Sequence, residues 1–332
     1  MSRIIILPAP EKIKTIVALA CGVAALCVAQ FAGAQNYPAR PIRIILPFTA
    51  GGGTDILARL LAQRLSEAFG QTALVDNRPG AGGNLGADLV AKSAPDGLTL
   101  LFSTTSTAIN ATLYTKLPFD IRKDLVAITQ VARSPVVVVT HPSVPARTVR
   151  ELVDLSKKAG GGLNFGSNGS GTVSHLAGTM LAQYSGVRLT HIPYKGASIA
   201  VTSLLSGEVE VEFQASTSVL PYIRVGKLRA LAVATKRRIA ALADTPTLDS
   251  IYPGLEIDQW YVVFAPAATP AGIVTRLHDE LVRALQHADV KTWMQRENSE
   301  PVGSSPAEAA ALLNAEINKY AKIVKASGAT AE

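Results

Sequence analysis

The feature that most constrains this chain is a regular alternation of short apolar runs and helical patterns after residue 37. Several runs are apolar at successive positions and rich in β-branched residues, which favours strands buried on both faces of a parallel sheet. The runs span residues 42–48, 98–103, 136–140, 189–194, 209–213, 228–235 and 261–265. Residues 55–69 and 174–184 place their apolar side chains on one helical face. The alternation predicts an α/β fold with mainly parallel sheets flanked by helices.

Local signals mark where helices begin. Thr148 and Ser305 are each followed three residues later by a glutamate, Glu151 and Glu308, so both sites predict capping boxes. Thr269, followed by Pro270, opens a third helix, which runs toward residue 287.

The alternation continues for nearly 300 residues without a repeat or a low-complexity linker, which is long for one lobe. We therefore predict two lobes. Extended segments near residues 133–142 and 258–266 are expected to cross between them. We place the first lobe at residues 35–136 and 260–332, and the second at residues 137–259.

The first 34 residues have the pattern of a secretory signal peptide. Their basic residues are Arg3, Lys12 and Lys14. An almost wholly apolar stretch, residues 15–31, leads to the small residues Ala32 and Ala34, so we expect cleavage before Gln35 and a periplasmic location. A retained membrane anchor is the alternative, although the stretch is short for a spanning helix. A lipoprotein attached through Cys21 lacks the usual large aliphatic residue three positions earlier.

Removing this segment changes the charge and the cysteine content. The chain has 32 basic and 25 acidic residues. Three of the basic residues and one of the acidic residues lie in this segment, so the mature part has 29 basic and 24 acidic residues. The basic residues are scattered, with the densest cluster at residues 236–238, which argues against nucleic acid. Cys21 and Cys27 are the two cysteines, so the mature chain has no thiol nucleophile, disulfide or cysteine-ligated metal.

Two glycine-rich connections between a strand and a helix are the main candidates for a binding site. The first loop, residues 46–55, contains three glycines and enters its helix at Asp55; the second loop, residues 164–175, enters its helix near Ser174. The first N–H groups of a helix lack internal partners and have partial positive charge. Glycines let the backbone approach a ligand, so each loop is predicted to bind an anion without a charged side chain. Ordinary strand–helix turns remain the alternative.

Other motifs point away from nucleotide binding. Neither loop continues into Gly-Lys-Ser/Thr or matches Gly-x-Gly-x-x-Gly. Residues 80–86 come close to the second motif, but the last glycine falls one residue late, so we interpret this segment as a turn that packs the lobes. The histidines show no metal-ligand spacing, and we expect no cofactor and no metal.

The sequence gives little support for catalytic residues. Ser174 and His175 are adjacent on a helix and therefore do not face each other. Asp55 is expected to cap its helix. Glu208, Glu210 and Glu212 share one face of a strand, which predicts a solvent-facing edge strand with Gln214 at its end reaching a cleft.

Several blocks, in order along the mature chain, are similar to one known family. They span residues 37–43, 47–55, 77–83, 95–101, 169–177, 192–196, 226–233 and 265–270. On these blocks the sequence resembles the extracytoplasmic solute receptors of tripartite tricarboxylate transporters, also called the Bug family. Residues 207–210 and 260–262 depart from the family's usual pattern, which leaves the identity of the substrate open.

The resemblance implies a two-lobed, type II-like periplasmic binding protein that closes on its ligand in a cleft between the lobes. Such a protein is not an enzyme. It captures a small carboxylate, such as a di- or tricarboxylate, an acidic amino acid or an aromatic acid, and acts as a monomer with inner-membrane permease subunits. A sensor for a membrane signalling partner and an exported hydrolase or lyase using Asp55 and His175 are the alternatives.

The resemblance also implies which residues bind the ligand. From the first loop these are Phe48, Thr49, Ala50, Gly51, Gly52, Gly53 and Asp55. From the second loop they are Asn168, Gly169, Ser170, Thr172 and His175. Ser103, Thr104 and Gln214, near the ends of strands, are further candidates.

Overall fold

The computed structural model describes residues 37–331, so the predicted signal peptide and its cleavage site lie outside the described residues. Contacts divide the chain after Ala39, and the fold described below belongs to the unit that begins at Arg40. Within residues 37–331, no helix combines the length and apolar character needed to span a membrane.

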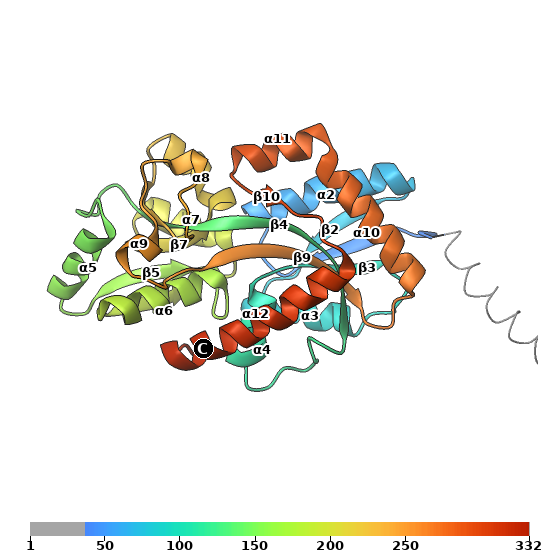
Figure 1. Cartoon of the computed structure of the whole chain (residues 1–332), viewed down its shortest axis with the longest axis horizontal. Helices are drawn as coiled ribbons and strands as arrows, with labels where there is room; N and C mark the ends of the chain where they lie inside the picture. The colour runs from blue at the N-terminus through green and yellow to red at the C-terminus, as the bar shows by residue number, and fades with distance from the viewer. Residues whose placement is uncertain (1–36, 332) are drawn as a thin grey trace, which may run out of the picture. The chain divides into compact units, whose positions relative to one another are not determined.

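The strands form one continuous hydrogen-bonded path in the order β2-β1-β3-β9-β4-β7-β5-β6, and β8 and β10 pair with β4 outside this path (Figure 1). The strands are β1 (Ile42–Leu46), β2 (Ala73–Asn77), β3 (Thr99–Thr104), β4 (Leu125–Thr140), β5 (Leu163–Ser167), β6 (Leu189–Pro193), β7 (Val211–Ala215), β8 (Arg229–Val233), β9 (Asp258–Pro266) and β10 (Glu300–Pro301). Two groups contain the parallel pairs, β2-β1-β3 and β7-β5-β6. The α/β prediction is therefore confirmed, with antiparallel strands between the two parallel groups.

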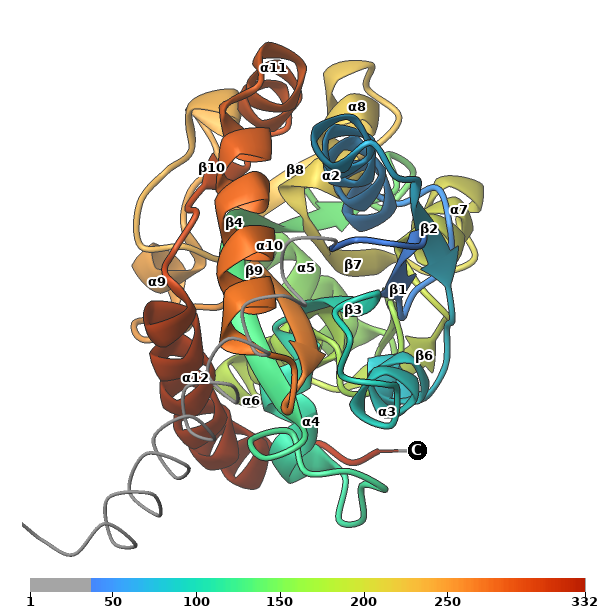
Figure 2. The same cartoon turned by 90° about the vertical axis from the view of Figure 1, so that its right-hand side faces the viewer.

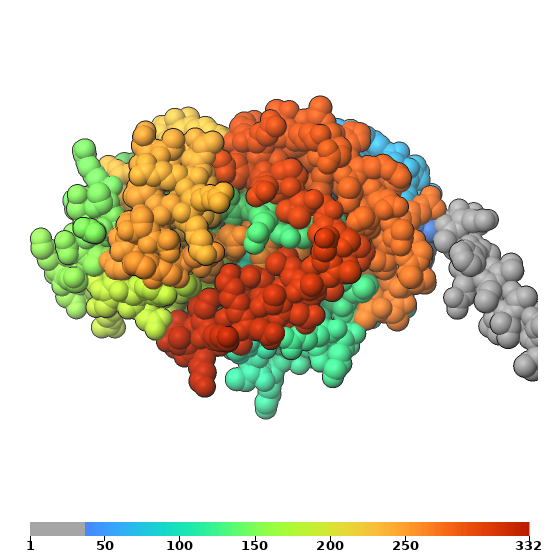
Figure 3. Space-filling view, in the orientation of Figure 1, coloured from blue at the N-terminus to red at the C-terminus, as the bar shows by residue number. Residues whose placement is uncertain are grey.

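Helices flank both groups of strands. They are α2 (Gly53–Phe69), α3 (Asn84–Ala91), α4 (Ser106–Leu113), α5 (Val149–Lys158), α6 (Val173–Ser185), α7 (Ala197–Ser206), α8 (Ser216–Arg224), α9 (Leu248–Ile251), α10 (Ala271–Gln286), α11 (Ala288–Arg296) and α12 (Pro306–Ser327), with short 3₁₀ turns η1 (Ala81–Gly83) and η2 (Ala240–Leu242). Helices α2 and α10 lie side by side (Figure 2), and the C-terminal helices α10, α11 and α12 form much of one face (Figure 3).

The long strands β4 and β9 connect the two groups. They pair antiparallel from Leu125 to Pro135, and β4 then continues to pair with β7 and β8. Strands occupy both places where the sequence predicted extended segments, although β4 is longer than the apolar run at residues 136–140 suggested. Nearly all residues of both strands are buried, because helices such as α12 and α10 pack against β4 and neighbouring strands pair with β4 and β9.

Trp260 and Tyr261 belong to the hydrophobic core. Both side chains are fully buried. The Trp260 indole donates a hydrogen bond to Glu316 at 3.1 Å, and the Tyr261 ring stacks on Phe102 with 6.0 Å between centroids. A buried indole N–H needs such an acceptor. The structure thus places this pair in the core.

The prediction of an edge strand at residues 208–213 is wrong. Strand β7 begins at Val211 and lies between β4 and β5, so it has a neighbour on each side. Glu208 precedes the strand and is exposed, whereas Glu212 is fully buried. Alternation alone does not show which strands are central, because that depends on pairing with distant segments.

One predicted capping box is confirmed and the other is only half formed. Ser305 accepts from the Glu308 N–H at 3.2 Å, and Glu308 accepts in return from the Ser305 N–H at 2.8 Å. Thr148 accepts from the Glu151 N–H at 3.1 Å, but the Glu151 carboxylate accepts instead from the N–H of Arg147. At the start of α5, the carboxylate of Glu151 therefore binds the N–H of the residue before the N-cap and not that of the N-cap itself.

Candidate functional site

The first loop connects β1 to α2 and is held in shape by Asp55. One carboxylate oxygen of Asp55 accepts from the Gly51 N–H at 3.0 Å and from Arg59 Nε at 2.9 Å; the other accepts from Asn77 Nδ2 at 3.0 Å. Burial acts to raise the pKa of Asp55, but the hydrogen bonds from Arg59, Gly51 and Asn77 outweigh it and lower the pKa. Both carboxylate oxygens accept hydrogen bonds from the protein, so Asp55 stabilises the conformation of the loop.

These hydrogen bonds of Asp55 leave the first N–H groups of α2 available to a ligand. Gly52 is the N-cap residue and has no side-chain cap. Within the described chain, the backbone N–H groups of Gly53 and Thr54 have no acceptor. Unpaired first-turn donors with partial positive charge favour an anion.

The second loop connects β5 to α6, and several of its backbone donors are used within the loop. The N–H groups of Asn168, Gly169 and Gly171 donate to Ser174 Oγ, Ser167 Oγ and His175 Nδ1, at 2.9, 3.1 and 3.3 Å. The N–H groups of Val173 and Ser174, the first two residues of α6, have no acceptor within the described chain, and neither has that of Ser170. The starts of both helices therefore offer free backbone donors.

The side chain of Asn168 is a further donor of the second loop. Its Oδ1 accepts from Gln214 Nε2 at 2.8 Å, which leaves Nδ2 as the outward donor. Gln214 Nε2 also donates to Glu212 Oε2 at 2.9 Å, and both of these β7 side chains are fully buried. Burial raises the pKa of Glu212 to about 8, against the opposing hydrogen bond from Gln214.

His175 lies beneath the second loop. Its ring stacks on His191 with 4.1 Å between centroids, and His191 Nε2 is 2.6 Å from Ser167 Oγ. Burial lowers the pKa of His175 to about 4; burial, together with the neighbouring His175, lowers that of His191 to about 3. Both rings are thus neutral at pH 7, and His175 supports the loop by accepting from Gly171.

The segment before and at the start of α7 contacts the first loop directly. Thr49 Oγ1 lies 2.8 Å from Ser198 Oγ, and the Thr49 N–H donates to the Lys195 carbonyl at 3.4 Å. Gly196 has a positive φ of 149°, and a Cβ there would lie 2.4 Å from Thr49 Oγ1. Only glycine allows this approach.

Residues of both loops enclose a small space, here called the inner cavity. It is lined by Phe48, Thr49, Gly52, Thr54, Asp55, Thr104, Asn168, Thr172, Ala197 and Gln259. Its volume open to the centre of a water molecule is about 20 Å³. That is room for about one water molecule, so the loops are close together in this structure.

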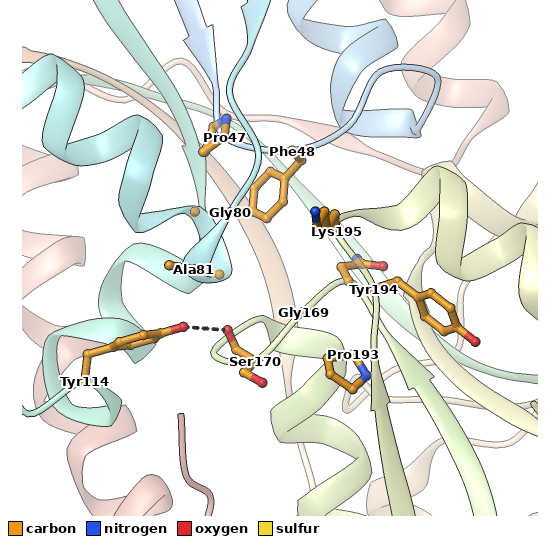
Figure 4. Close-up of a pocket in the computed structure, with 13 residues that line it drawn as sticks. Pro47, Phe48, Gly80, Ala81, Tyr114, Gly169, Ser170, Pro193, Tyr194 and Lys195 are labelled. Carbon is orange, nitrogen blue, oxygen red and sulfur yellow. Dashed lines mark hydrogen bonds between the residues drawn. The ribbon is translucent and has the colours of Figure 1, made fainter. Parts of the chain in front are cut away.

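A larger space, the outer cavity, adjoins it and has a volume of about 180 Å³ (Figure 4). It is lined by Pro47, Phe48, Gly80, Ala81, Gly82, Gly83, Tyr114, Asn168, Gly169, Ser170, Pro193, Tyr194 and Lys195. Phe48 and Asn168 line both cavities, so the two are contiguous. Across the outer cavity, the Tyr114 hydroxyl donates to the Ser170 carbonyl at 3.4 Å.

The structure brings together most of the residues predicted for the site. Those that line a cavity are Phe48, Thr49, Gly52, Asp55, Thr104, Asn168, Gly169, Ser170 and Thr172. Those that line neither are Ala50, Gly51, Gly53, Ser103, His175 and Gln214. Three residues that line neither cavity still make hydrogen bonds that support the site. Gly51 bonds Asp55, His175 bonds Gly171, and Gln214 bonds Asn168.

Sequence reasoning missed part of the lining. The residues not predicted include those of the turn at 80–83, Tyr114, Lys195, Ala197 and Gln259. Lys195 lies in a block that resembles the known family, and the turn had been interpreted as packing. The turn does pack closely, since a Cβ on Gly82 would lie 2.2 Å from the Ser170 carbonyl oxygen.

This geometry suits capture of a small anion and not turnover. Asp55 and His175, the pair considered for a hydrolase, belong to different loops, and His175 lines neither cavity. Thr54, which has a free backbone N–H, and the amide side chain of Asn168 instead line the inner cavity together. Fold and site together define an α/β solute-binding protein.

Comparison with known proteins gives the family. Residues 57–329 match the model of the tripartite tricarboxylate transporter family receptor. Protein BugT of Bordetella pertussis is 36% identical over 310 residues, covering 92% of this chain and 95% of that protein. The protein therefore belongs to this family, as its sequence blocks indicated.

Solved structures agree with this assignment. The periplasmic binding protein BugD is 31% identical with a TM-score of 0.86, covering 89% of this chain and 99% of BugD. An R. palustris protein with adipate is 33% identical with a TM-score of 0.84, covering 89% of this chain and 99% of that protein. MatC from Rhodopseudomonas palustris with bound malate is 30% identical (TM-score 0.84; 87% and 100% covered). The protein is thus a periplasmic solute-binding receptor and not an enzyme, which confirms the prediction.

Proposed function

We propose that this receptor captures a small carboxylate-bearing metabolite in the two contiguous cavities and presents it to inner-membrane permease subunits of a tripartite tricarboxylate transporter. The observation that supports this most directly is the inner cavity. There, Thr54, which has a free first-turn N–H of α2, and Asn168, whose Nδ2 is free to donate, line the same cavity. A carboxylate group would accept from both loops at once. Related proteins solved with adipate and malate support a carboxylate ligand.

We also propose that the two groups of strands act as lobes, at residues 35–136 with 260–332 and at residues 137–259. Ligand entry then requires the loops to separate, because the inner cavity holds about one water molecule. Separation would break at least three hydrogen bonds: Thr49 Oγ1 to Ser198, the Thr49 N–H to the Lys195 carbonyl, and Tyr114 to Ser170. Each contributes on the order of 1 kcal/mol, so opening is affordable at physiological temperature. The receptor acts as a monomer, exported after cleavage before Gln35.

Calorimetry of the purified protein against di- and tricarboxylates, acidic amino acids and aromatic acids tests the function. Binding of at least one class with a stoichiometry of one, and recovery of the ligand unchanged, is the expected result. Absence of binding to every class would contradict the proposal. The mass of any small molecule that co-purifies with the protein would name the ligand.

The variant Gly52→Asp tests the position of the site. Gly52 lines the inner cavity, and a carboxylate there would repel the ligand's anion. Gly160→Asp is the matched control, because Gly160 is exposed with open space around its Cα. We expect binding to be lost in the first variant and kept in the second. Unchanged affinity in Gly52→Asp would remove the first loop from the site.

A further inference from the structure

Glu212 is a fully buried carboxyl group that is separated from the inner cavity by two hydrogen bonds. Its Oε2 accepts from Gln214 Nε2 at 2.9 Å, and the same nitrogen donates at 2.8 Å to Asn168, which lines the cavity. Its Oε1 is buried and has no hydrogen-bond partner in the described part of the chain. A buried carboxylate with an uncompensated oxygen is costly, so this position favours the neutral acid.

The space around Glu212 suits a carboxyl group and separates it from the two buried histidines. Gly166 is its register neighbour on β5, and a Cβ there would lie 2.4 Å from Glu212 Oε1, so a side chain at position 166 would displace the carboxyl group. Phe165 precedes Gly166 and points to the opposite face of the sheet. His175 and His191 both stack on Phe165, at 6.5 and 4.9 Å between centroids, so their rings lie on that opposite face.

Among the described residues that pack against Glu212, no positive side chain balances its charge. Strand β5, helix α7 and the part of β4 that pairs with β7 contain no ionisable side chain. Helix α8 has Tyr222 and one basic residue, Arg224, which forms an ion pair with Glu297 at 3.3 Å. An ionised Glu212 would therefore be an uncompensated negative charge.

The acidic groups near Glu212 do not stabilise its ionised form either. Glu208 is exposed, and Glu210 accepts from the Asn164 N–H at 2.8 Å. Tyr194 lies near both Glu208 and Glu212, and its ring points away from the outer cavity (Figure 4). Burial raises the pKa of Tyr194, and the two glutamates add to that rise, so its hydroxyl stays neutral.

An anion in the inner cavity would lie close to Glu212. Two negative charges in a medium of low dielectric constant repel each other, so a bound carboxylate disfavours ionisation of Glu212. By linkage the reverse also holds: an ionised Glu212 weakens capture of the anion, and capture in that state draws in a proton. Burial raises the pKa of Glu212 to about 8, so both forms of the free receptor are populated near that pH.

We propose that Glu212 couples ligand capture to proton uptake, so that the receptor binds its anion tightly while Glu212 is protonated and more weakly once it has ionised. This inference rests on the proposed function, since it assumes that an anion occupies the inner cavity. Glu212 is a positioning residue: it lines neither cavity and acts through Gln214 and Asn168.

Calorimetry as a function of pH tests the coupling, with malate, citrate, adipate, glutamate and benzoate as probes. Their carboxylates stay ionised between about pH 7 and 9, whereas Glu212 changes its charge. Wild-type affinity for a probe that binds is expected to fall by about 5- to 10-fold across this range. That is the effect expected when the bound anion raises the pKa of Glu212 to between about 9 and 10.

Two glutamine variants identify the group that titrates. The affinity of Glu212→Gln should not change over the same range, because glutamine does not ionise. Glu208→Gln is the matched control, since Glu208 is exposed and lines neither cavity, and it should keep the wild-type pH dependence. Thermal unfolding checks that both variants fold.

Wild-type protein alone gives a second readout. Binding heats are compared at about pH 8.5 in Tris and in EPPS, two buffers that release protons with different enthalpies. The difference should show uptake of about half a proton for each ligand bound. If a probe binds without proton uptake, or if Glu212→Gln keeps the wild-type pH dependence, the coupling is overturned while the carboxylate receptor stands. Failure to bind any probe or any acid of the wider panel would overturn the proposed function and the coupling with it.

Discussion

Gln214 donates from Nε2 to Oδ1 of Asn168 at 2.8 Å, so a fully buried side chain of β7 sets the orientation of an amide that lines both cavities. The same Nε2 donates to Glu212. The second loop thus adds a side-chain donor, fixed in position by β7, to the backbone donors that the starts of α2 and α6 both offer.

Replacing Asn168 should test how much its side-chain donor contributes to ligand binding. Asn168→Asp exchanges the outward Nδ2 donor for a carboxylate oxygen, so ligand affinity should fall by more than about 100-fold through lost bonding and added repulsion. Asn168→Ala removes the donor alone and should cost about 10-fold. Calorimetry measures both, and thermal unfolding checks the fold. A smaller loss in the aspartate variant than in the alanine variant would contradict the orientation assigned to this amide.

The buried Glu212 predicts a pH dependence of stability. Its pKa is near its ordinary 4.5 when unfolded and about 8 when folded, so the folded state binds more protons across this window. The contribution of Glu212 is therefore complete below pH 4.5 and is lost as the pH rises to 8. Glu212→Gln remains neutral, so its free energy of unfolding relative to wild type should increase between pH 4.5 and 8.

Chemical denaturation at several pH values measures this difference. His175 and His191 act in the opposite direction, because their lowered pKa values reduce stability as the pH falls below 6.5. They are present in both proteins and cancel in the comparison. A difference that stays constant from pH 4.5 to 8 would show that Glu212 ionises normally.

The contact between the turn at residues 80–83 and the second loop can be tested with a pair of alanine variants. Gly82 has a φ of 60°, and a Cβ there would lie 2.2 Å from the Ser170 carbonyl oxygen; Gly186 has a φ of 67° with open space around it. Both substitutions incur a backbone cost of about 1 kcal/mol. Gly82→Ala alone should also push the second loop away, which lowers ligand affinity as well as the unfolding temperature. Equal effects of the two variants on affinity would exclude this contact from ligand binding.

Much of the site follows from local sequence. The strand run before residue 48, the glycines at 51–53 and the helix pattern after Asp55 are adjacent in the chain, and the physics of a helix start needs nothing distant. The same holds for the second loop and for the capping box at Ser305. These predictions concern contacts within a few residues, where spacing alone decides geometry.

Other parts of the site depend on pairing between distant segments. Glu212 looked like a solvent-facing residue because its neighbours alternate, yet β7 lies between β4 and β5, and burial followed from that position. The turn at residues 80–83 meets Ser170 only because the first and second groups of strands come together. Lys195 faces a cavity formed by residues from 47 to 195, and no local pattern marks it.

The amino-acid sequence by itself therefore determined the α/β class, the two helix-start loops and the family, since each depends on short-range spacing or on ordered blocks of residues. The tertiary structure decided which donors remain free. Asp55 is occupied by Gly51, Arg59 and Asn77, whereas Asn168 is turned outward by Gln214. The bonds from Asn77 to Asp55 and from Gln214 to Asn168 join residues 22 and 46 positions apart, so they form only when the strands pack.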